Sequence, residues 1–181
     1  MTQFAQAPTI ETPRLRLRHH RIEDLEVFAT FYASDRAIYV DPPRNPSHLW
    51  YGFASEVGSW SLVGQGGWAI ETHDGALVGQ VAITQPPHFP EREIGWTAFD
   101  GFEGKGLVFE AASAALAWAW DQGFDTLVSY IDPKNQRSIA LATRLGAVHD
   151  PDAALPLGDT AEDTVVYRHS PDADGGPEAY A

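Results

Sequence analysis

The sequence predicts a single α/β domain, because segments with the spacing of strands alternate with segments that have the spacing of helices. Two further observations favour this fold class. A hydrophobic content of 44% over 181 residues is enough to bury a core. No internal repeat or linker-like segment divides the chain. We therefore expect one domain over residues 8–170 and a disordered tail over residues 171–181.

The first half of the chain is expected to contain a strand, a helix and a β-hairpin. The alternation in RLRLR, residues 14–18, is typical of a half-exposed strand, and the spacing of apolar residues over 22–34 predicts a helix. The expected buried face of this helix consists of Ile22, Leu25, Phe28, Ala29 and Tyr32. The segment DPPRNP, residues 41–46, interrupts regular structure. Residues 67–83 then predict a hairpin that turns at Asp74-Gly75, because Asp-Gly suits a two-residue hairpin turn.

The second half is expected to alternate strands with helices. A strand over 92–99 leads into a glycine-rich loop, and the apolar helix that follows over 107–122 should be buried. A strand over 126–131 precedes a helix over 135–145, which Gly146 is expected to cap. The last predicted strand covers residues 164–167.

The composition argues against several classes of function. The absence of cysteine excludes disulfides, thiolate metal ligands and a cysteine nucleophile, and the seven scattered histidines give no reason to expect a metal site. A net charge of −13 disfavours nucleic-acid binding, because phosphate contacts need clustered Lys and Arg. The chain has no run of 18 apolar residues, and its N-terminus does not resemble a signal peptide. We therefore expect a cytoplasmic protein that does not bind membranes.

The segment GFEGKGLVFEAA, residues 101–112, places three glycines and a lysine directly before a helix. Such turns bind phosphate groups, because main-chain N–H groups and the helix dipole converge there. The segment is not a Walker loop, since Gly106 follows Lys105 where Ser or Thr is required. It is not a dinucleotide fingerprint either, since Phe109 stands where Gly or Ala is required. The segment indicates a phosphate-binding loop of another kind, with a plain strand-to-helix turn as the alternative.

Four motifs in this order, TPRLRLR, the hairpin, EIGW and LGA, resemble those of the GNAT acetyltransferases, and more closely their RimJ/RimL-like branch of protein and peptide N-acetyltransferases. The resemblance implies a GNAT-like mixed, mostly antiparallel, splayed sheet flanked by helices. Acetyl-CoA would be the acetyl donor, with its pyrophosphate on the N–H groups of the loop and its pantetheine along the preceding strand. The resemblance implies these cofactor-binding residues: Trp96, Ala98, Gly104, Lys105, Gly106, Leu107, Val108 and Asn135.

Two residues depart from the family's loop pattern of Gln/Arg-x-x-Gly-x-Gly/Ala. Val108 replaces Gly or Ala, and Glu103 replaces Gln or Arg, which places a carboxylate near an anionic cofactor. Because the loop would bind through its main chain, we expect Glu103 to point to solvent. At a distance of about 8 Å in water, the repulsion would then cost only about 0.5 kcal/mol.

The reaction that the resemblance implies is direct attack of an amine on the thioester. The tyrosine acid of many family members would fall at Ala142, so Ser138 is the candidate donor to the leaving thiolate, as in RimL-like members. Glu93 is the candidate general base. Each assignment has a structural alternative. Ser138 could bond to its own helix, Glu93 could be an exposed strand-end carboxylate, and Asn135 could be an ordinary N-cap.

The acceptor that the resemblance implies is the α-amine of a protein or peptide. Such a group has a pKa of about 7.7–8.0, is partly neutral at pH 7 and needs only a weak base. One alternative is a small-molecule amine such as a polyamine, an antibiotic or an amino acid. The other is a module that binds CoA without catalysis. Four aromatic residues lie where the family builds its acceptor site, although core packing is the alternative for them: Trp50, Tyr51, Phe53 and Trp60. The sequence leaves a homodimer open.

Overall fold

The computed structural model describes residues 5–40 and 45–171, and the chain divides into two compact units. The first unit consists of residues 1–82 and 96–111, and the second of residues 83–95 and 112–181. Three elements contribute to both units, namely β4 (Leu77–Thr84), β5 (Glu93–Ala98) and α3 (Leu107–Asp121). Apart from Pro171, the tail that the sequence predicts to be disordered lies outside the described residues.

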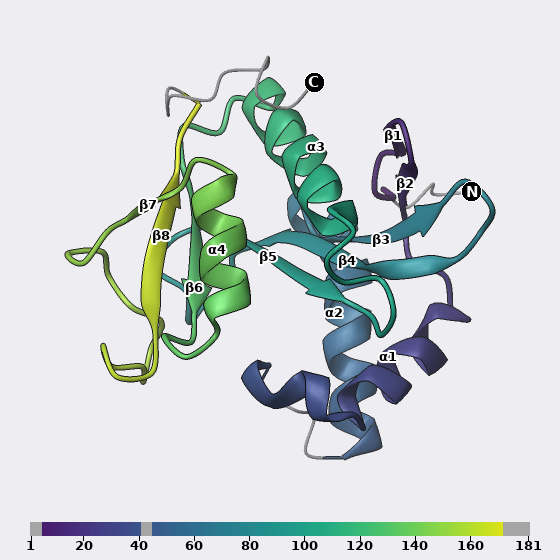
Figure 1. Cartoon of the computed structure of the whole chain (residues 1–181), viewed down its shortest axis with the longest axis horizontal. Helices are drawn as coiled ribbons and strands as arrows, with labels where there is room; N and C mark the ends of the chain where they lie inside the picture. The colour runs from purple at the N-terminus through teal and green to yellow at the C-terminus, as the bar shows by residue number, and fades with distance from the viewer. Residues whose placement is uncertain (1–4, 41–44, 172–181) are drawn as a thin grey trace. The chain divides into compact units, whose positions relative to one another are not determined.

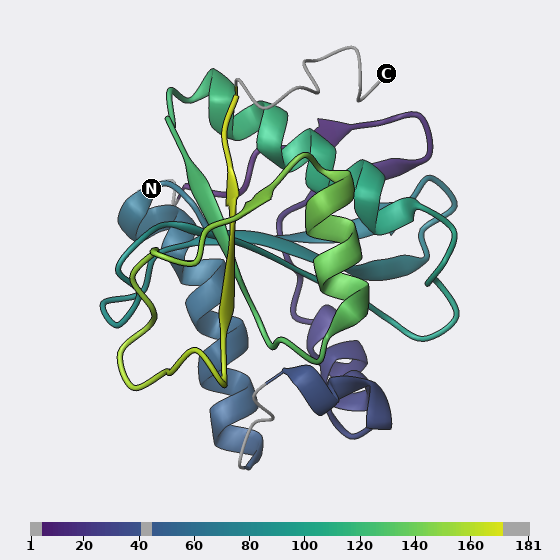
Figure 2. The same cartoon turned by 60° about the vertical axis from the view of Figure 1, so that its left-hand side comes forward.

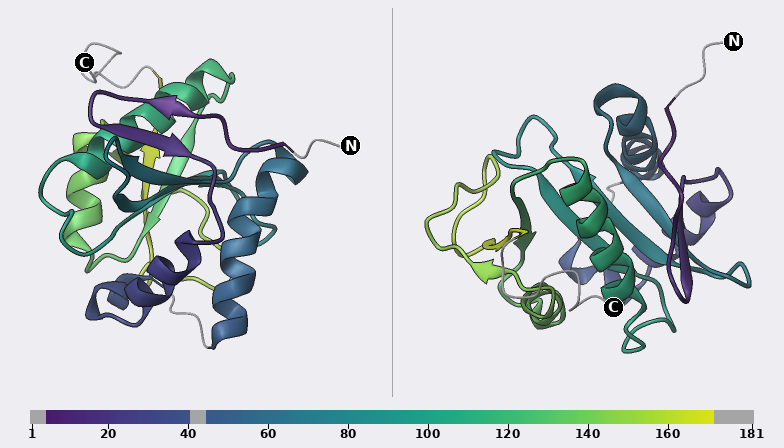
Figure 3. Two further views of the ribbon diagram at one scale, coloured as in Figure 1. Left: turned by 90° about the vertical axis from the view of Figure 1, so that its right-hand side faces the viewer. Right: turned by 90° about the horizontal axis from the view of Figure 1, so that it is seen from above.

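The first unit is built on antiparallel strands. Strands β1 (Ile10–Glu11), β2 (Leu15–Arg18), β3 (Gly67–Thr72) and β4 pair in chain order. Figure 3 shows β1 and β2 beside the hairpin of β3 and β4. The hairpin turns through Gly75, which has a φ of 95°. This left-handed conformation favours glycine, so the Asp74-Gly75 turn is confirmed.

Gly79 in β4 lets β5 approach closely. A Cβ atom at Gly79 would lie 1.9 Å from the carbonyl oxygen of Thr97, and any side chain is therefore excluded there. Just beyond this contact, the N–H of Phe99 donates to the carbonyl of Val78 at 2.8 Å. Together these contacts fix the segment Trp96–Ala98 against β4.

An aromatic core joins the helices of the first unit to the end of β5. The helices are α1 (Asp24–Tyr32), the 3₁₀ helix η1 (Asp35–Tyr39) and α2 (Pro46–Val63), and α2 contacts both α1 and β3 (Figure 1). Phe28 of α1 packs edge-to-face on Phe99 and on Phe53 of α2, with ring centroids 5.0 and 5.6 Å apart. Because Phe99 directly precedes the glycine-rich loop, this core also holds the base of the loop.

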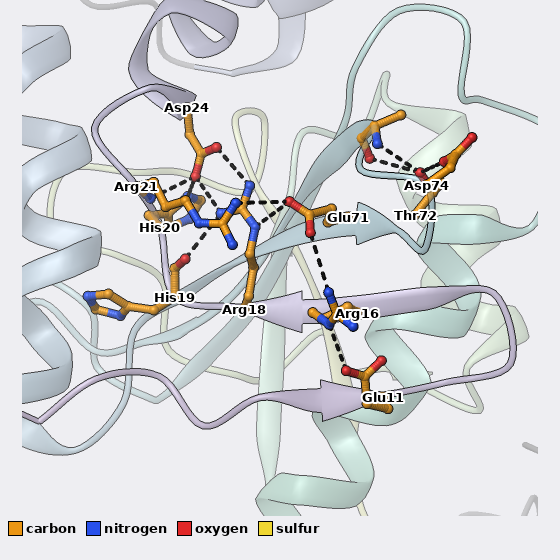
Figure 4. Close-up of polar contacts among 11 residues, drawn as sticks. Glu11, Arg16, Arg18, His19, His20, Arg21, Asp24, Glu71, Thr72 and Asp74 are labelled. Atoms are coloured by element: carbon orange, nitrogen blue, oxygen red, sulfur yellow. Dashed lines mark hydrogen bonds and ion pairs between the residues drawn. The ribbon is translucent and has the colours of Figure 1, made fainter.

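Helix α1 begins two residues later than predicted, and part of the predicted buried face is wrong. Ile22 is 60% exposed, whereas Asp24 and Phe31 are buried. The cause is a bidentate ion pair, in which Arg18 donates to the two carboxylate oxygens of Asp24 at 2.8 and 2.9 Å (Figure 4). Since a buried charge needs a partner, this pair keeps Asp24 on the inner side of the helix start and leaves Ile22 outside.

The second unit combines parallel and antiparallel pairs. The start of β5 pairs in parallel with β6 (Leu127–Ile131), which is antiparallel to β8 (Val165–His169), and β8 is antiparallel to β7 (Val148–His149). Helix α4 (Gln136–Arg144) contacts β6 and β8 (Figures 1 and 2). The helix ends at Gly146, which has a φ of 85°, so the predicted glycine cap is confirmed.

Ser129 and His169 form a buried side-chain pair next to the parallel contact of Glu93 with Val128. The hydroxyl of Ser129 donates to the carbonyl of Ile94 at 2.7 Å, and Nε2 of His169 lies 3.0 Å from the same hydroxyl oxygen. Burial lowers the pKa of His169 to about 4, so its ring is neutral at pH 7. Because the Ser129 proton is already donated, Nε2–H of His169 is the donor to Ser129.

Across the described residues, the strands have the hydrogen-bonded order β1-β2-β3-β4-β5-β6-β8-β7. The β5–β6 pair is parallel, while the pairs from β1 to β4 and from β6 to β7 are antiparallel. The predicted class, an α/β fold with a mixed and mostly antiparallel sheet, is therefore confirmed. No helix in the described part of the chain is long and apolar enough to cross a membrane.

Candidate active site

The glycine-rich loop over residues 100–106 joins β5 to α3 in the first unit. Gly101, Gly104 and Gly106 have φ values of 83°, 69° and 71°, which side chains other than glycine rarely tolerate. A Cβ atom at Gly104 would meet no other atom within 4 Å. The main chain at Gly104 is therefore open to approach by another molecule.

Helix α3 begins directly after this loop. The N–H of Glu110 donates to the carbonyl of Gly106 at 3.1 Å, which is the first turn of the helix. The N–H groups of Leu107 and Val108 consequently have no acceptor within the helix, and the positive end of the helix dipole lies at the same place. The side chains of both residues are buried, so Val108 fits here although the family prefers Gly or Ala.

Arg14 determines which way the peptide groups of the loop point. Its guanidinium donates to the carbonyls of Lys105 and Gly106 at 3.0 and 3.3 Å, and its Nε pairs with Glu110 Oε2 at 2.5 Å. In a trans peptide the N–H points away from the C=O. The N–H groups of Gly106 and Leu107, which share these two peptides, therefore point away from Arg14. We call the contacts of Arg14 with Lys105, Gly106 and Glu110 the Arg14 brace.

Glu103 does not point to free solvent as the sequence led us to expect. It is one-third exposed and forms an ion pair with Arg36 of η1, which also donates to the carbonyl of Ala98 at 3.4 Å. The pKa of Glu103 is lowered, chiefly by a hydrogen bond from its own N–H; burial opposes this shift, and the charge of Arg36 adds a smaller lowering effect. Arg36, from a different element, thus partly compensates the negative charge of Glu103. A fully solvent-exposed Glu103 would have had no such partner.

The other candidate residues lie in the second unit. Asn135 caps α4 through Oδ1, which accepts the N–H of Ser138 at 3.2 Å, so the structural alternative describes at least part of its role. Glu93 is half-buried, and its Oε1 lies 3.6 Å from the Cβ position of Gly95. Ala142 is fully buried against the interior. The structure brings Asn135 and Ser138 together on one turn, whereas Trp96, Ala98 and residues 104–108 belong to the first unit.

The aromatic residues of α2 divide between two environments. Phe53 and Trp60 are buried, and the indole N–H of Trp60 donates to the carbonyl of Gly67 at 2.9 Å. Trp50 and Tyr51 are 46% and 65% exposed. The core-packing alternative therefore holds for Phe53 and Trp60, while Trp50 and Tyr51 remain available to contact an acceptor.

Comparison with known proteins shows that the chain belongs to the GNAT acetyltransferases, since the acetyltransferase (GNAT) domain matches residues 14–148. A solved acetyltransferase from Agrobacterium tumefaciens str. C58 is 36% identical with a TM-score of 0.84, over 93% of this chain and 98% of that one. RimL, the ribosomal L7/L12 α-N-protein acetyltransferase solved with coenzyme A, is 17% identical with a TM-score of 0.73, over 92% and 100%. The microcin C7 self-immunity acetyltransferase MccE, solved with acetyl-CoA and AMP, is 18% identical with a TM-score of 0.70, over 88% and 93%.

The protein is therefore an acyltransferase, and acetyl-CoA is its acetyl donor. The residues of the loop fit a phosphate group of this donor, because Gly101 and Gly104 leave the main chain accessible and the N–H groups of Gly106 and Leu107 face away from Arg14. The Arg14 brace and the Arg36–Glu103 pair were not found from the sequence. Their partners are separated by more than 60 residues, and local spacing contains no signal for such pairs.

Replacement of Arg14 tests the brace. In Arg14→Gln the carbonyls of Lys105 and Gly106 lose their charged donor, and we expect the affinity for CoA to fall about tenfold, or about 1.4 kcal/mol, by calorimetric titration. The melting temperature should barely change, because an exposed ion pair contributes at most about 1 kcal/mol. Arg16→Gln is the matched control, since Arg16 of β2 forms a similarly exposed ion pair with Glu11 of β1. Equal loss of affinity in both variants would contradict a specific role of Arg14.

Replacement of each partner in the Arg36–Glu103 pair should change CoA affinity in opposite directions. Glu103→Gln removes a negative charge and frees Arg36, so binding should tighten, and more so at low salt where screening is weak. Arg36→Gln leaves the carboxylate uncompensated, so binding should weaken. The salt dependence of the dissociation constant is the measurement. A shift in the same direction for both variants would show that the pair acts only on loop structure.

Proposed function

We propose that the protein transfers an acetyl group from acetyl-CoA to the α-amine at the N-terminus of a protein or peptide. The observation that carries the donor half of this proposal is the loop with its carbonyls held by Arg14 and its N–H groups directed outward. The acceptor half is supported by the resemblance to the RimJ/RimL-like branch and by the similarity of the fold to RimL. The cytoplasmic location that the sequence analysis expects stays a prediction, and so does the homodimer that it leaves open.

In the proposed reaction, the amine nitrogen attacks the thioester carbonyl carbon, the C–S bond breaks, and sulfur leaves as a thiolate that takes up a proton. The cofactor-binding residues proposed for the pyrophosphate are Gly104, Lys105, Gly106, Leu107 and Val108, with Trp96, Ala98 and Asn135 for the pantetheine. Ser138 is the proposed donor to the thiolate, and Glu93 remains a candidate for the base. The side-chain amide nitrogen of Asn135 is available to contact the pantetheine, because the helix cap uses only Oδ1.

A thiol-release assay with a panel of acceptors tests the proposal. The panel contains peptides with free and blocked N-termini, a blocked peptide with one lysine, a polyamine, an aminoglycoside and free amino acids. The proposal expects turnover of free N-termini that blocking abolishes. Turnover of the small amines alone would favour a small-molecule acceptor. Binding of CoA without turnover of any acceptor would contradict the catalytic proposal altogether.

The two residues of the α4 start should affect different kinetic constants. If Ser138 stabilises the leaving sulfur, Ser138→Ala should lower kcat by about tenfold to a few hundredfold with little change in the KM for acetyl-CoA. Folding should not suffer, because alanine is the better helix former. Asn135→Ala should instead raise the KM for acetyl-CoA, and Asn135→Ser, which keeps an N-cap, separates binding from helix capping. An unchanged kcat in Ser138→Ala would contradict this role of Ser138 and indicate that water supplies the proton to the thiolate.

A further inference from the structure

The glycine-rich loop contains one cationic side chain, Lys105. This side chain is exposed, and it forms no ion pair with any of the described residues. The two arginines that contact the loop are both engaged, Arg14 with Glu110 and Arg36 with Glu103. Of the three cations at the loop, Lys105 is therefore the one whose charge no described carboxylate cancels.

The ring of Phe102 determines where the ammonium of Lys105 lies. Nζ of Lys105 is 5.5 Å from the centroid of the Phe102 ring, which is within the range of about 6 Å for a cation–π contact. Phe102 packs against the aromatic core that contains Phe28 and Phe99, and its N–H donates to the carbonyl of Phe99 at 3.2 Å. The ring that carries the ammonium is thus attached to the core of the first unit.

The main chain of Lys105 is held as well. Arg14 donates to the carbonyl of Lys105 at 3.0 Å, and the flanking Gly104 and Gly106 have φ values of 69° and 71°. The side chain of Lys105 is therefore fixed at its Cα by these contacts and at its ammonium by the Phe102 ring. A side chain that is already held in place loses less conformational freedom when it binds a ligand.

A ligand has free access to this part of the loop. Gly104 and Lys105 are both exposed, and a Cβ atom at Gly104 would meet no other atom within 4 Å. Because the Cα atoms of adjacent residues lie only about 3.8 Å apart, a phosphate at the main chain of Gly104 is within reach of the long Lys105 side chain. Two adjacent residues thus offer main-chain donors and a cation to the same kind of anion.

We propose that the ammonium of Lys105 binds a phosphate group of acetyl-CoA and that Phe102 is its positioning residue. This inference rests on the function proposed above, and it adds a side-chain contact to the main-chain contact proposed there for Lys105. The ammonium supplies a full charge where the main-chain N–H groups supply only dipoles. The loop thereby selects a phosphorylated donor over a thioester of pantetheine. The pyrophosphate and the 3′-phosphate of CoA share this chemistry, and the ligands used below distinguish them.

The lysine NMR signals test this contact directly, because the sequence contains two lysines, Lys105 and Lys134. In protein labelled with [¹³C]lysine, we expect the Cε–H signals of Lys105 to shift saturably with CoA but not with pantetheine. Lys134 is the internal control, since it directly precedes Asn135 and should respond equally to both ligands. Saturable binding of CoA that shifts the Lys105 signals no more than pantetheine does would overturn the inference.

The same spectra test the role of Phe102 before any ligand is added. The ring current of Phe102 should move the Cε–H signals of Lys105 upfield of those of Lys134, and Phe102→Leu should remove this difference. Affinity for CoA should also fall in Phe102→Leu, because the ammonium is no longer held in place. A Lys105 signal that is unchanged in Phe102→Leu would contradict the positioning role.

The affinity of the lysine variants for CoA provides a second test. Lys105→Gln should weaken binding about fivefold in a calorimetric titration, and by more at low salt, because the lost contact is an exposed charge pair. Lys134→Gln removes the same charge from the chain and should leave the affinity unchanged. Equal losses in the two variants would show that only the overall charge matters and would overturn the inference.

Titration with 3′-dephospho-CoA identifies the phosphate that Lys105 contacts. If the contact is with the pyrophosphate, Lys105→Gln should weaken the binding of this ligand as much as that of CoA. If the contact is with the 3′-phosphate, the effect of Lys105→Gln should disappear. Either result supports a phosphate contact, whereas an effect of Lys105→Gln that persists with pantetheine would overturn it.

The inference and the proposed function can fail separately. Binding of CoA and acetyl transfer that both remain unchanged in Lys105→Gln would overturn the inference while the acetyltransferase function stood. An affinity for CoA that depends on Lys105, without turnover of any acceptor in the panel, would support the contact and contradict the catalytic proposal.

Discussion

The direction of the peptide groups around Gly106 depends on one side chain, Arg14. Its guanidinium holds two successive carbonyls and the carboxylate of Glu110, so the matching N–H groups must face the other way. The side chain of Arg14 is half exposed, and its ion pair stabilises the fold by at most about 1 kcal/mol. Arg14 therefore matters mainly because it orients the peptide groups of the loop. It turns the N–H groups of Gly106 and Leu107 away from the guanidinium, which is the orientation that the proposed phosphate contact requires.

Cations and carboxylates are paired around the loop in a chain whose net charge is −13. Arg14 bonds to the carbonyls of Lys105 and Gly106 within the loop, and Arg36 bonds to the carbonyl of Ala98 just before it. Arg36 also compensates Glu103, the one carboxylate that the family pattern does not lead one to expect. The aromatic core behind Phe99 and the close contact of Gly79 with Thr97 hold this loop in place. Arg36 therefore offsets the carboxylate that would otherwise repel an anionic donor at the proposed site.

Local sequence signals predicted the elements well and the long-range contacts poorly. The Asp74-Gly75 turn, the glycine loop and the Gly146 cap depend on residues adjacent in sequence, and each is where the sequence predicts it. The exposure of Ile22 was missed because it depends on the Arg18–Asp24 pair, which local periodicity does not contain. The Arg14 brace and the compensation of Glu103 were missed for the same reason. In each case the chemistry depends on side chains that only the folded chain brings together.

The most direct test of the account is a titration of ¹⁵N-labelled protein with CoA, followed through the main-chain amide signals. The account predicts large saturable shifts for the N–H groups of Gly104, Gly106, Leu107 and Val108, with the same dissociation constant for each. The shifts should depend on phosphate, so pantetheine alone should not produce them. Saturable binding of CoA with these four amides unchanged would contradict the central claim that this loop holds the phosphates of the donor.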